Sequence, residues 1–397
     1  MSFSILDNKT PLLPTAGFLE TNLRSRPTWV EIDLEALASN FRITRDLVGP
    51  AVSVMAVVKA DAYGHGAIEC ARRLQEEGAD WFGVALPEEG SQLRKAGILG
   101  SILCMGGFWP GQAGELVEKD LIPAVYRLEM LEELDRAAAA AGKIVNAHLK
   151  IDTGMGRLGV RFEELPAFAE KLESFKNVWI DGVMTHFASA DQAGQDEFTR
   201  TQAARFEAAV KQLESYGIRP RFSDLANSAG TVSYPIARGN LVRPGGILYG
   251  LWRDILQPNE NPLPFQNVMS LYTRITMLKE VPAGEMIGYG STFQTSRKSL
   301  IATLPIGYHD GFVRANSNRG KVIIRGHFAP VVGRVSMDLT ILDVTDVPGV
   351  ELFDKVTMIG DESGLSVYAE EMAAAVGTLS YEITCGISGR VPRVYLR

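Results

Sequence analysis

Short apolar runs alternate with longer segments of helical periodicity from residue 29 to about residue 242. Runs of this kind predict strands of a parallel sheet that is buried on both faces, and the segments between them predict the covering helices. Residues 129–141 are rich in alanine, and residues 195–216 carry apolar side chains at helical spacing. A (β/α)8 barrel fits this alternation better than an open doubly wound sheet, which stays open as the alternative. The eight predicted strands are residues 52–58, 81–85, 101–105, 122–126, 147–151, 179–184, 222–225 and 240–242.

The helical periodicity mostly ends at the stretch QPNENPLP, residues 257–264, whose composition is typical of a linker. Beyond it lie β-branched runs broken by glycine and proline, with one late helix near residues 368–376. The predicted β runs are residues 270–281, 300–304, 321–324, 329–335 and 355–359. We therefore predict a leader of residues 1–27, a barrel domain of residues 28–262 and a mainly β domain of residues 263–397.

The composition is that of a globular enzyme and argues against several other classes. The 397 residues are 46% hydrophobic and 22% charged, and the net charge of −7 disfavours a nucleic-acid or membrane-surface partner. No apolar run approaches the roughly 18 residues of a membrane span, and the start MSFSILDNKTPLLPT lacks the features of a secretory signal. Three scattered cysteines without metal-ligand spacing and only five histidines predict free thiols, no metal site and a cytoplasmic location.

Lys59 follows the first predicted barrel strand, in VSVMAVVKADAYGHG. The C-terminal ends of barrel strands form the catalytic face, so this lysine is expected there. Desolvation lowers the pKa of a lysine, which makes the amine a better nucleophile toward an aldehyde and a usable base. The alternative is a lysine that only extends from a strand end into solvent. Tyr63 comes four residues later, before a Gly-His-Gly turn into a helix, where a hydroxyl beside a helix N-terminus can hold a phosphate.

The motif AVVKADAYGHG at residues 56–66 resembles the cofactor-lysine signature of the alanine racemase family. Members of that family are pyridoxal 5′-phosphate enzymes with a barrel domain and a β domain. The resemblance continues through several separated motifs from about Trp29 to Arg397. It implies that Lys59 holds the cofactor as a Schiff base and that Tyr63 contacts its phosphate.

Two further motifs follow the fifth and sixth barrel strands. HLKIDTGMGRLG places Arg157 on a glycine-rich loop, where its forked donors can reach an anionic oxygen. The resemblance implies that Arg157 binds the phenolic oxygen of the cofactor and helps with the substrate carboxylate, and that Lys150 is carbamylated and positions this arginine. His186, in DGVMTHFASAD, is implied to lie against the pyridine ring and to orient a catalytic tyrosine.

The last two barrel strands end in loops where barrel enzymes often bind phosphate. LANSAG supplies Asn227 and Ser228, and VRPGGILYG supplies Gly245 and Gly246, whose amides can approach a phosphate closely. The family usually has a branched apolar residue where this chain has Gly246, a change that retains the backbone donor. Arg243 is implied to donate to the pyridine nitrogen. Because arginine does not readily release its proton, that nitrogen stays unprotonated, the ring is a weaker electron sink and transamination is suppressed.

The C-terminal motifs are implied to complete the site of the partner subunit in a homodimer. EMIGYGSTF carries Tyr289, by position an ordinary aromatic, which the resemblance makes the second acid–base residue. GRVSMDLT carries Met337, whose backbone amide is implied to lie near the substrate carboxylate, and Ser336, where many members have cysteine. Tyr308, in LPIGYHDGF, resembles a tyrosine at the mouth of the site. Tyr381, in SYEITCGISGRVPRVY, resembles one that bounds the pocket and contacts the phosphate.

The activity implied is alanine racemisation through an external aldimine with two opposed bases, Lys59 toward D-alanine and Tyr289 toward L-alanine, which supplies D-alanine for peptidoglycan. Alternatives are a racemase of serine or of broader range, and an amino-acid decarboxylase of the same architecture. The decarboxylases generally place an acidic residue at the pyridine nitrogen, where this chain has Arg243. A lone-barrel cofactor carrier would lack the C-terminal domain, and a purely structural protein would not combine these motifs.

Overall fold

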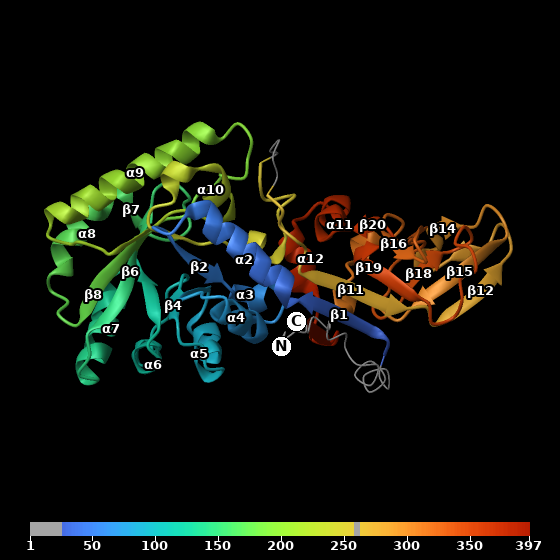
Figure 1. The fold of residues 1–397 in the computed structure, drawn as a ribbon, viewed down its shortest axis with the longest axis horizontal. Helices are drawn as coiled ribbons and strands as arrows, with labels where there is room; N and C mark the ends of the chain where they lie inside the picture. The colour runs from blue at the N-terminus through green and yellow to red at the C-terminus, as the bar shows by residue number, and fades with distance from the viewer. Residues whose placement is uncertain (1–25, 258–262) are drawn as a thin grey trace, which may run out of the picture. The chain divides into compact units, whose positions relative to one another are not determined.

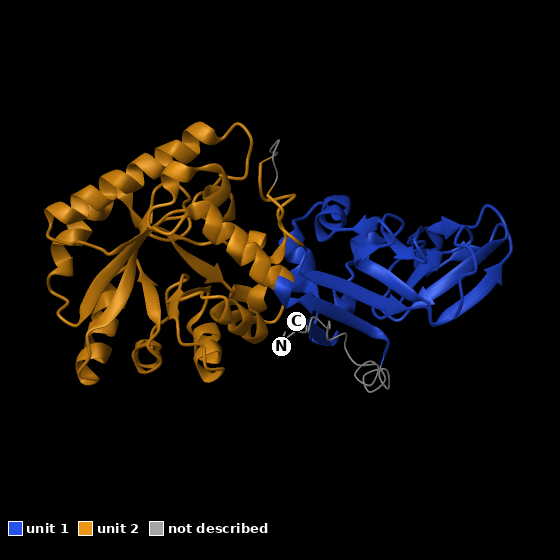
Figure 2. Cartoon of the chain, viewed as in Figure 1, with its two compact units in different colours: residues 1–35, 267–397 blue, residues 36–266 orange. Residues whose placement is uncertain are grey.

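The computed structural model describes residues 26–257 and 263–397 of the chain (Figure 1). They divide into two compact units, coloured separately in Figure 2. Residues 36–266 form one, here called the barrel unit, and residues 267–397 together with the described residues up to 35 form the other, the β unit. The predicted leader before residue 26 and residues 258–262 of the predicted linker lie outside the described residues.

The described part of the barrel unit contains eight parallel strands in the order β10-β2-β3-β4-β5-β6-β8-β9, with the short β7 (Val160–Arg161) beside β6. The ends of this sheet approach each other, because the amide of Asn240 donates to the carbonyl of Ser223 at 3.3 Å. The predicted barrel is thus confirmed, as a nearly closed one. The strands are β2 (Ser53–Val57), β3 (Trp81–Val84), β4 (Ser101–Cys104), β5 (Ile122–Val125), β6 (Val145–Asp152), β8 (Val178–Met184), β9 (Phe222–Asp224) and β10 (Leu241–Val242).

Helices cover the outside of this sheet (Figure 1). Apolar side chains fill its inside. The inner cluster includes Met55, Trp81 and Leu103, and it leaves a packed core, not a channel. Functional side chains can therefore gather only at the strand ends. The helices are α2 (Leu34–Val48), α4 (Ala67–Glu76), α5 (Pro87–Lys95), α6 (Ala113–Glu118), α7 (Leu128–Ala140), α8 (Leu165–Leu172), α9 (Asp196–Ser215) and α10 (Ser228–Ser233).

The β unit is mainly β, as predicted. One sheet has the order β17-β16-β19-β11-β1-β21 with β20 beside β19; a second has the order β12-β15-β18, and β13 pairs with β14. Its helices are α11 (Ala369–Val376) and α12 (Ser380–Gly386). The strands are β1 (Thr28–Asp33), β11 (Met269–Arg274), β12 (Met277–Val281), β13 (Met286–Ile287), β14 (Phe293–Gln294), β15 (Ser299–Leu304), β16 (Lys321–Ile324), β17 (His327–Pro330), β18 (Thr340–Asp343), β19 (Lys355–Glu362), β20 (Leu365–Val367) and β21 (Arg393–Leu396).

Several elements differ from the sequence prediction. The strand β1 lies between β11 and β21, so the residues from 28 to 35 join the β unit although the predicted barrel domain begins at residue 28. Residues 331–335, predicted as strand, make only an isolated bridge between Val331 and Leu342. The helix α12 was not predicted. No strand was predicted at residues 28–33, and a short apolar run does not show which sheet it would join, which explains the first difference. Within the described ranges, no helix is long and apolar enough to cross a membrane.

Candidate active site

Directly after β2, the chain makes a turn in the left-handed helical conformation. Lys59 opens it, and residues 60–63 all have φ between 53° and 55°. Left-handed backbone costs about 1–2 kcal/mol for each residue with a side chain. Hydrogen bonds offset part of this cost: Glu89 accepts the amide of Ala60 at 2.7 Å, and Asp61 accepts the amide of Ala67 at 2.7 Å. The turn is therefore held from two neighbouring helices.

The turn brings Tyr63 against the loop after β10. A Cβ at Gly245 would lie 2.2 Å from the Tyr63 hydroxyl, so only glycine leaves room for this approach. The amide of Gly245 donates to the hydroxyl of Ser228 at 3.0 Å. The ring of Tyr63 packs on Tyr249 with 5.1 Å between centroids, and Tyr249 donates to the carbonyl of Val57 at 2.9 Å. Three predicted phosphate ligands, Tyr63, Ser228 and Gly245, thus lie together.

Asn227 and Gly246 occupy the starts of two short helices in the same region. The side chain of Asn227 accepts the amide of Gly230 at 2.9 Å, which makes it the N-cap of α10 and sets the position of Ser228. Gly246 begins a 3-10 helix, Gly246–Tyr249, and is buried. The structure thus gives Asn227 a capping function in addition to its predicted contact with the cofactor.

Arg243 lies almost completely buried beside the ends of β8 and β9. Its guanidinium forms an ion pair with Asp224 and donates to the carbonyl of Thr185 at 2.6 Å. Nη2 also lies 3.3 Å from Nδ1 of His186. The predicted pair of Arg243 and His186 is therefore in direct contact. Burial, then the charge of Arg157, lowers the pKa of Arg243 to about 9, so the guanidinium still carries its charge at neutral pH.

Positive charge accumulates at this end of the barrel. Lys150 is 6% exposed and donates to the carbonyl of Met105 at 3.1 Å. Burial, followed by the charges of Arg243, Arg157 and Lys59, lowers its pKa to about 7. Burial and the same cations hold the pKa of His186 well below its usual range, so this imidazole is neutral. Cations that repel one another in a buried site are stabilised by a negative charge, so this site favours an anionic ligand.

The loop with Arg157 is anchored through its backbone. Asp152, at the end of β6, accepts the amides of Gly154 and Gly156, both at 3.0 Å, and lies 3.2 Å from Arg161. Although burial opposes it, these hydrogen bonds keep the pKa of Asp152 below its usual range. The loop is thus fixed while the side chain of Arg157 is exposed and can reach a ligand.

The β unit has a hollow of about 460 Å³ that brings three of its predicted residues together. Tyr289, Tyr308 and Met337 line it, and all three are exposed, Tyr289 to 74%. Tyr381, in α12, is not among the lining residues. Arg334 lies against the turn of Tyr289, because a Cβ on Gly290 would be 2.8 Å from the guanidinium.

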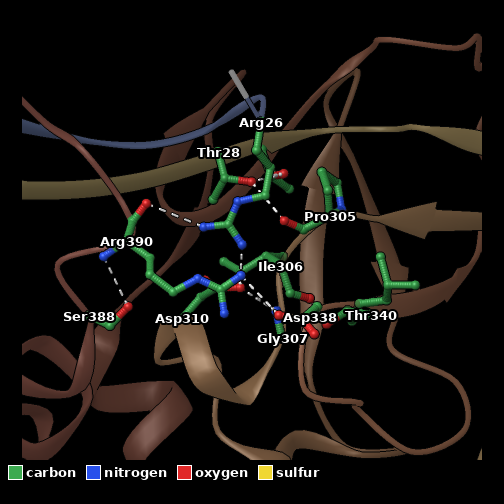
Figure 3. Close-up of polar contacts among 12 residues, drawn as sticks. Arg26, Thr28, Pro305, Ile306, Gly307, Asp310, Asp338, Thr340, Ser388 and Arg390 are labelled. Carbon is green, nitrogen blue, oxygen red and sulfur yellow. Dashed lines mark hydrogen bonds and ion pairs between the residues drawn. The ribbon is translucent and has the colours of Figure 1, made fainter. Parts of the chain in front are cut away.

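Ion pairs hold the two loops that carry Tyr308 and Met337, and Figure 3 shows these pairs around Asp310. Asp310 is 1% exposed, and Arg26 at 2.7 Å and Arg390 at 3.4 Å converge on its carboxylate. Arg390 also contacts Asp338 at 2.9 Å. The amide of Tyr308 donates to the carbonyl of Ser336 at 3.0 Å, which joins the loops directly. The hollow is therefore shaped by a buried carboxylate that the sequence analysis did not single out.

Sequence reasoning also missed Asp224 and His148 in the barrel and Glu89 beside the lysine turn. A signal existed for the first two, since a charged or polar residue inside an apolar strand run is seldom buried without a partner. Glu89 gave none, because it resembles any acidic residue in the first turn of a helix.

A nearly closed parallel barrel carries a lysine, a cradle formed by Tyr63, Ser228 and Gly245, and clustered cations at its strand ends, and it is joined to a β domain. This combination defines a pyridoxal-phosphate-dependent barrel enzyme. The sequence models "Alanine racemase, N-terminal domain" and "Alanine racemase, C-terminal domain" match residues 32–252 and 268–395. The chain belongs to the alanine racemase family. Alanine racemases of Halothermothrix orenii and Geobacter sulfurreducens are both 44% identical to it over 94% of this chain and 97% and 98% of their own lengths.

Solved structures give the same result. The alanine racemase of Streptomyces lavendulae matches with a TM-score of 0.87 at 37% identity over 94% of this chain and 98% of that one. The enzyme of Bacillus anthracis with bound L-Ala-P matches with a TM-score of 0.86 at 35% identity, over 94% of this chain and 96% of that one. That of Bartonella henselae with covalently bound pyridoxal phosphate matches with 0.83 at 30% identity, over 94% and 100%. The predicted family, the alanine racemase activity and the pyridoxal phosphate cofactor are confirmed.

Proposed function

We propose that this alanine racemase exchanges the α-hydrogen of alanine between two bases, Lys59 and Tyr289, on opposite faces of the substrate. Inversion requires that one group removes a proton from one face while another delivers a proton to the other face. In this proposal, Lys59 takes the hydrogen of D-alanine and Tyr289 that of L-alanine. An ordinary tyrosine with a pKa near 10 is a weak base at neutral pH, so we expect Arg157 and the neutral imidazole of His186 to orient and tune Tyr289.

The residues at the barrel mouth fit pyridoxal phosphate. When bound, the cofactor withdraws electrons from Cα of the amino acid and so acidifies the α-hydrogen. Lys59 would hold it covalently, and Tyr63, Ser228 and the amides of Gly245 and Gly246 would hold its phosphate. The observation that carries this assignment is the close approach of the Tyr63 hydroxyl to the backbone of Gly245, where a Cβ would lie only 2.2 Å from that hydroxyl. Asn227, as the cap beside Ser228, and Tyr381 are proposed to border this phosphate.

Arg243 is proposed to bind the ring nitrogen of the cofactor. With a pKa of about 9 it stays protonated at neutral pH, so it donates a hydrogen bond without giving up its proton. The ring then remains a modest electron sink. This arrangement favours return of the proton to Cα, which is the outcome that racemisation needs.

Lys150 is proposed to carry a carbamate. A pKa of about 7 leaves much of its amine neutral at physiological pH. A neutral amine adds to carbon dioxide with formation of an N–C bond and release of one proton. The resulting anion would lie among Arg157, Arg243 and Lys59 and offset their mutual repulsion. We propose that it positions Arg157, which with the backbone amide of Met337 would bind the substrate carboxylate, while Tyr308 lines the approach.

We further propose a homodimer in which the β domain, predicted as residues 263–397, completes the site on the partner's barrel domain, predicted as residues 28–262. The exposure of Tyr289, Tyr308 and Met337 on the β unit supports a surface that is covered in an assembly. Mixed dimers test this arrangement. Lys59→Ala and Tyr289→Phe proteins are each expected to be inactive, and mixing them after dissociation should restore about one quarter of wild-type activity, because half of the dimers then hold one intact site. No recovery on mixing would mean that each chain completes its own site.

The activity itself is tested by exchange at Cα. L-Alanine or L-serine is incubated with the protein in D2O, with and without added pyridoxal phosphate, and both isotope content and the D/L ratio are measured. Cofactor-dependent exchange of alanine with a ratio that approaches one is expected. Faster exchange of serine would make the chain a racemase of broader range.

The free thiols of Cys70, Cys104 and Cys385 support a reducing compartment, and we propose the cytoplasm.

A further inference from the structure

The strand β9 ends in Asp224, a buried carboxylate that has no part in the assignments above. Asp224 and His148 are both completely buried, and Arg243 is 3% exposed. One oxygen of Asp224 forms the ion pair with Nη1 of Arg243, and the other lies 2.9 Å from Nδ1 of His148. A carboxylate that is bound on both oxygens in a buried site has a fixed orientation.

His148, on β6, is itself held firmly. Its ring stacks on Phe222 with 6.1 Å between centroids and lies 5.5 Å from the ring of Trp81. A Cβ on Gly182 would be 2.4 Å from the imidazole, so the ring fills the space that this glycine leaves. Burial lowers the pKa of His148 to about 3. The imidazole is therefore neutral, and its Nδ1–H donates to Asp224.

The guanidinium of Arg243 is fixed through its two terminal nitrogens. Nη2 donates to the carbonyls of Thr185 at 2.6 Å and Leu225 at 3.3 Å, and Nη1 binds Asp224. Across residues 26–257 and 263–397, Nε has no acceptor. Both terminal nitrogens of Arg243 are thus anchored, and its Nε–H is left for a ligand.

We propose that Asp224, supported by His148, is a positioning residue that keeps Arg243 charged and directs its remaining N–H donor toward the cofactor's ring nitrogen. This inference rests on the proposed role of Arg243. Asp224 supplies the negative charge that a buried guanidinium requires, and His148 stops the carboxylate from rotating. The unit of three residues joins β6 and β9 to the segment after β10.

The arrangement decides where a proton goes. After Lys59 or Tyr289 removes the α-proton, the electron pair of the C–H bond remains with the substrate. In racemisation a proton returns to Cα from the opposite face. In transamination the proton would instead end on the cofactor, and hydrolysis would release pyruvate and leave the amino group on the cofactor. A tilted Arg243 would leave the ring nitrogen free to take a proton, which strengthens the electron sink and favours the second outcome.

The test compares four variants of the holoenzyme. Asp224→Asn removes the negative charge, His148→Phe removes the donor to Asp224, and His148→Asn retains a donor in nearly the same place. Asp181→Asn is the matched control: Asp181 is 1% exposed and binds Arg221 at 2.7 Å within the same sheet, but at the other end of its strands. Three quantities are measured: pyruvate formed per racemisation event, the dissociation constant for pyridoxal phosphate, and the unfolding temperature.

Asp224→Asn is expected to raise the pyruvate ratio and the dissociation constant by about tenfold, the size of effect typical of residues that orient a ligand-binding group. His148→Phe should change both in the same direction by a smaller factor, and His148→Asn should restore values close to wild type. Asp181→Asn should lower the unfolding temperature and leave both ratio and affinity unchanged.

Wild-type values in folded Asp224→Asn or His148→Phe protein would overturn the inference, as would an equal rise in pyruvate from Asp181→Asn. If Asp224→Asn does not fold, the two His148 variants decide, because they leave the ion pair with Arg243 in place. The reaction of the wild-type protein distinguishes failure of the proposed function from failure of the role of Asp224. A wild-type protein that binds no pyridoxal phosphate and racemises no alanine would refute the proposed function, whereas an active wild type with unaffected variants would refute only the role of Asp224.

Discussion

The contact between Gly245 and Tyr63 predicts that Gly245→Ala specifically damages phosphate binding. The new Cβ would lie 2.2 Å from the Tyr63 hydroxyl and 3.0 Å from the adjoining ring carbon, whereas Cβ contacts shorter than 3.0 Å are essentially never found. The hydroxyl must therefore move by 0.8 Å, the difference between 3.0 and 2.2 Å. Tyr63 cannot move far, because its ring packs on Tyr249 at 5.1 Å.

A displacement of this size would remove the hydrogen bond that we propose between Tyr63 and the phosphate. A bond of about 2.7 Å would stretch to about 3.5 Å, where it contributes little. Hydrogen bonds to charged groups are worth about 1.5–3 kcal/mol, so the dissociation constant for pyridoxal phosphate should rise by roughly 10–100-fold. Overpacking should also lower the free energy of unfolding by about 1–3 kcal/mol.

The assay is a titration of pyridoxal phosphate into four proteins from which it has been removed: wild type, Gly245→Ala, Tyr63→Phe and the double variant. Because the phenylalanine lacks the clashing oxygen, the double variant should bind about as weakly as Tyr63→Phe alone. Gly114→Ala, where a Cβ meets open space in α6, serves as the control and should bind normally. Additive losses in the double variant, or normal binding by Gly245→Ala, would refute this account of the cradle.

Three further predictions concern residues that support or position groups of the candidate site. Glu89→Gln replaces one carboxylate oxygen with an NH2 group, so either the amide of Ala60 or that of Ala85, each held at 2.7 Å, loses its acceptor. This loss should lower the free energy of unfolding by about 1–3 kcal/mol and weaken cofactor binding. Unchanged thermal unfolding would contradict this. Asp310→Asn should lower unfolding free energy by roughly 1–3 kcal/mol, since Arg26 and Arg390 are partly exposed, and raise KM for alanine more than it lowers kcat; a normal KM would contradict it. Because the pKa of Lys150 is lowered to about 7, its reactive neutral amine grows above that pH and declines below it, so a carbamate signal in ¹³C NMR with labelled bicarbonate should rise with pH through this range and be absent in Lys150→Arg. A signal independent of pH would indicate that another group sets it.

The barrel was predictable because a parallel strand that is buried on both faces leaves a continuous apolar run, and all eight runs became strands within the described barrel unit. The left-handed turn after Lys59 was not, because ordinary residues such as Ala60 and Asp61 rarely adopt that conformation and do so here only through contacts with other helices. Likewise, Arg26 and Asp310 meet only through the tertiary fold, so neither shows its partner in the sequence.

The candidate site divides in the same way. Motif residues such as Lys59, Tyr63 and Arg243 could be placed at strand ends from the sequence, and the structure finds them there. Their supporting residues Asp224 and His148 could not be assigned, since their meaning depends on a contact between strands 76 residues apart. A single sequence reveals the chemistry of such residues but not their distances.

The position of β1 has a consequence for how the protein is made. This strand leaves the ribosome early, yet its sheet neighbours β11 and β21 come after the whole barrel unit, and β21 holds residues 393–396. At about 5–20 residues per second, β1 waits on the order of twenty seconds to a minute for its last neighbour. The barrel unit has no such delay, so we expect it to fold during synthesis while β1 stays an unpaired strand that could bind a neighbouring nascent chain. Chaperone demand should therefore depend on β21 more than on any strand of the barrel.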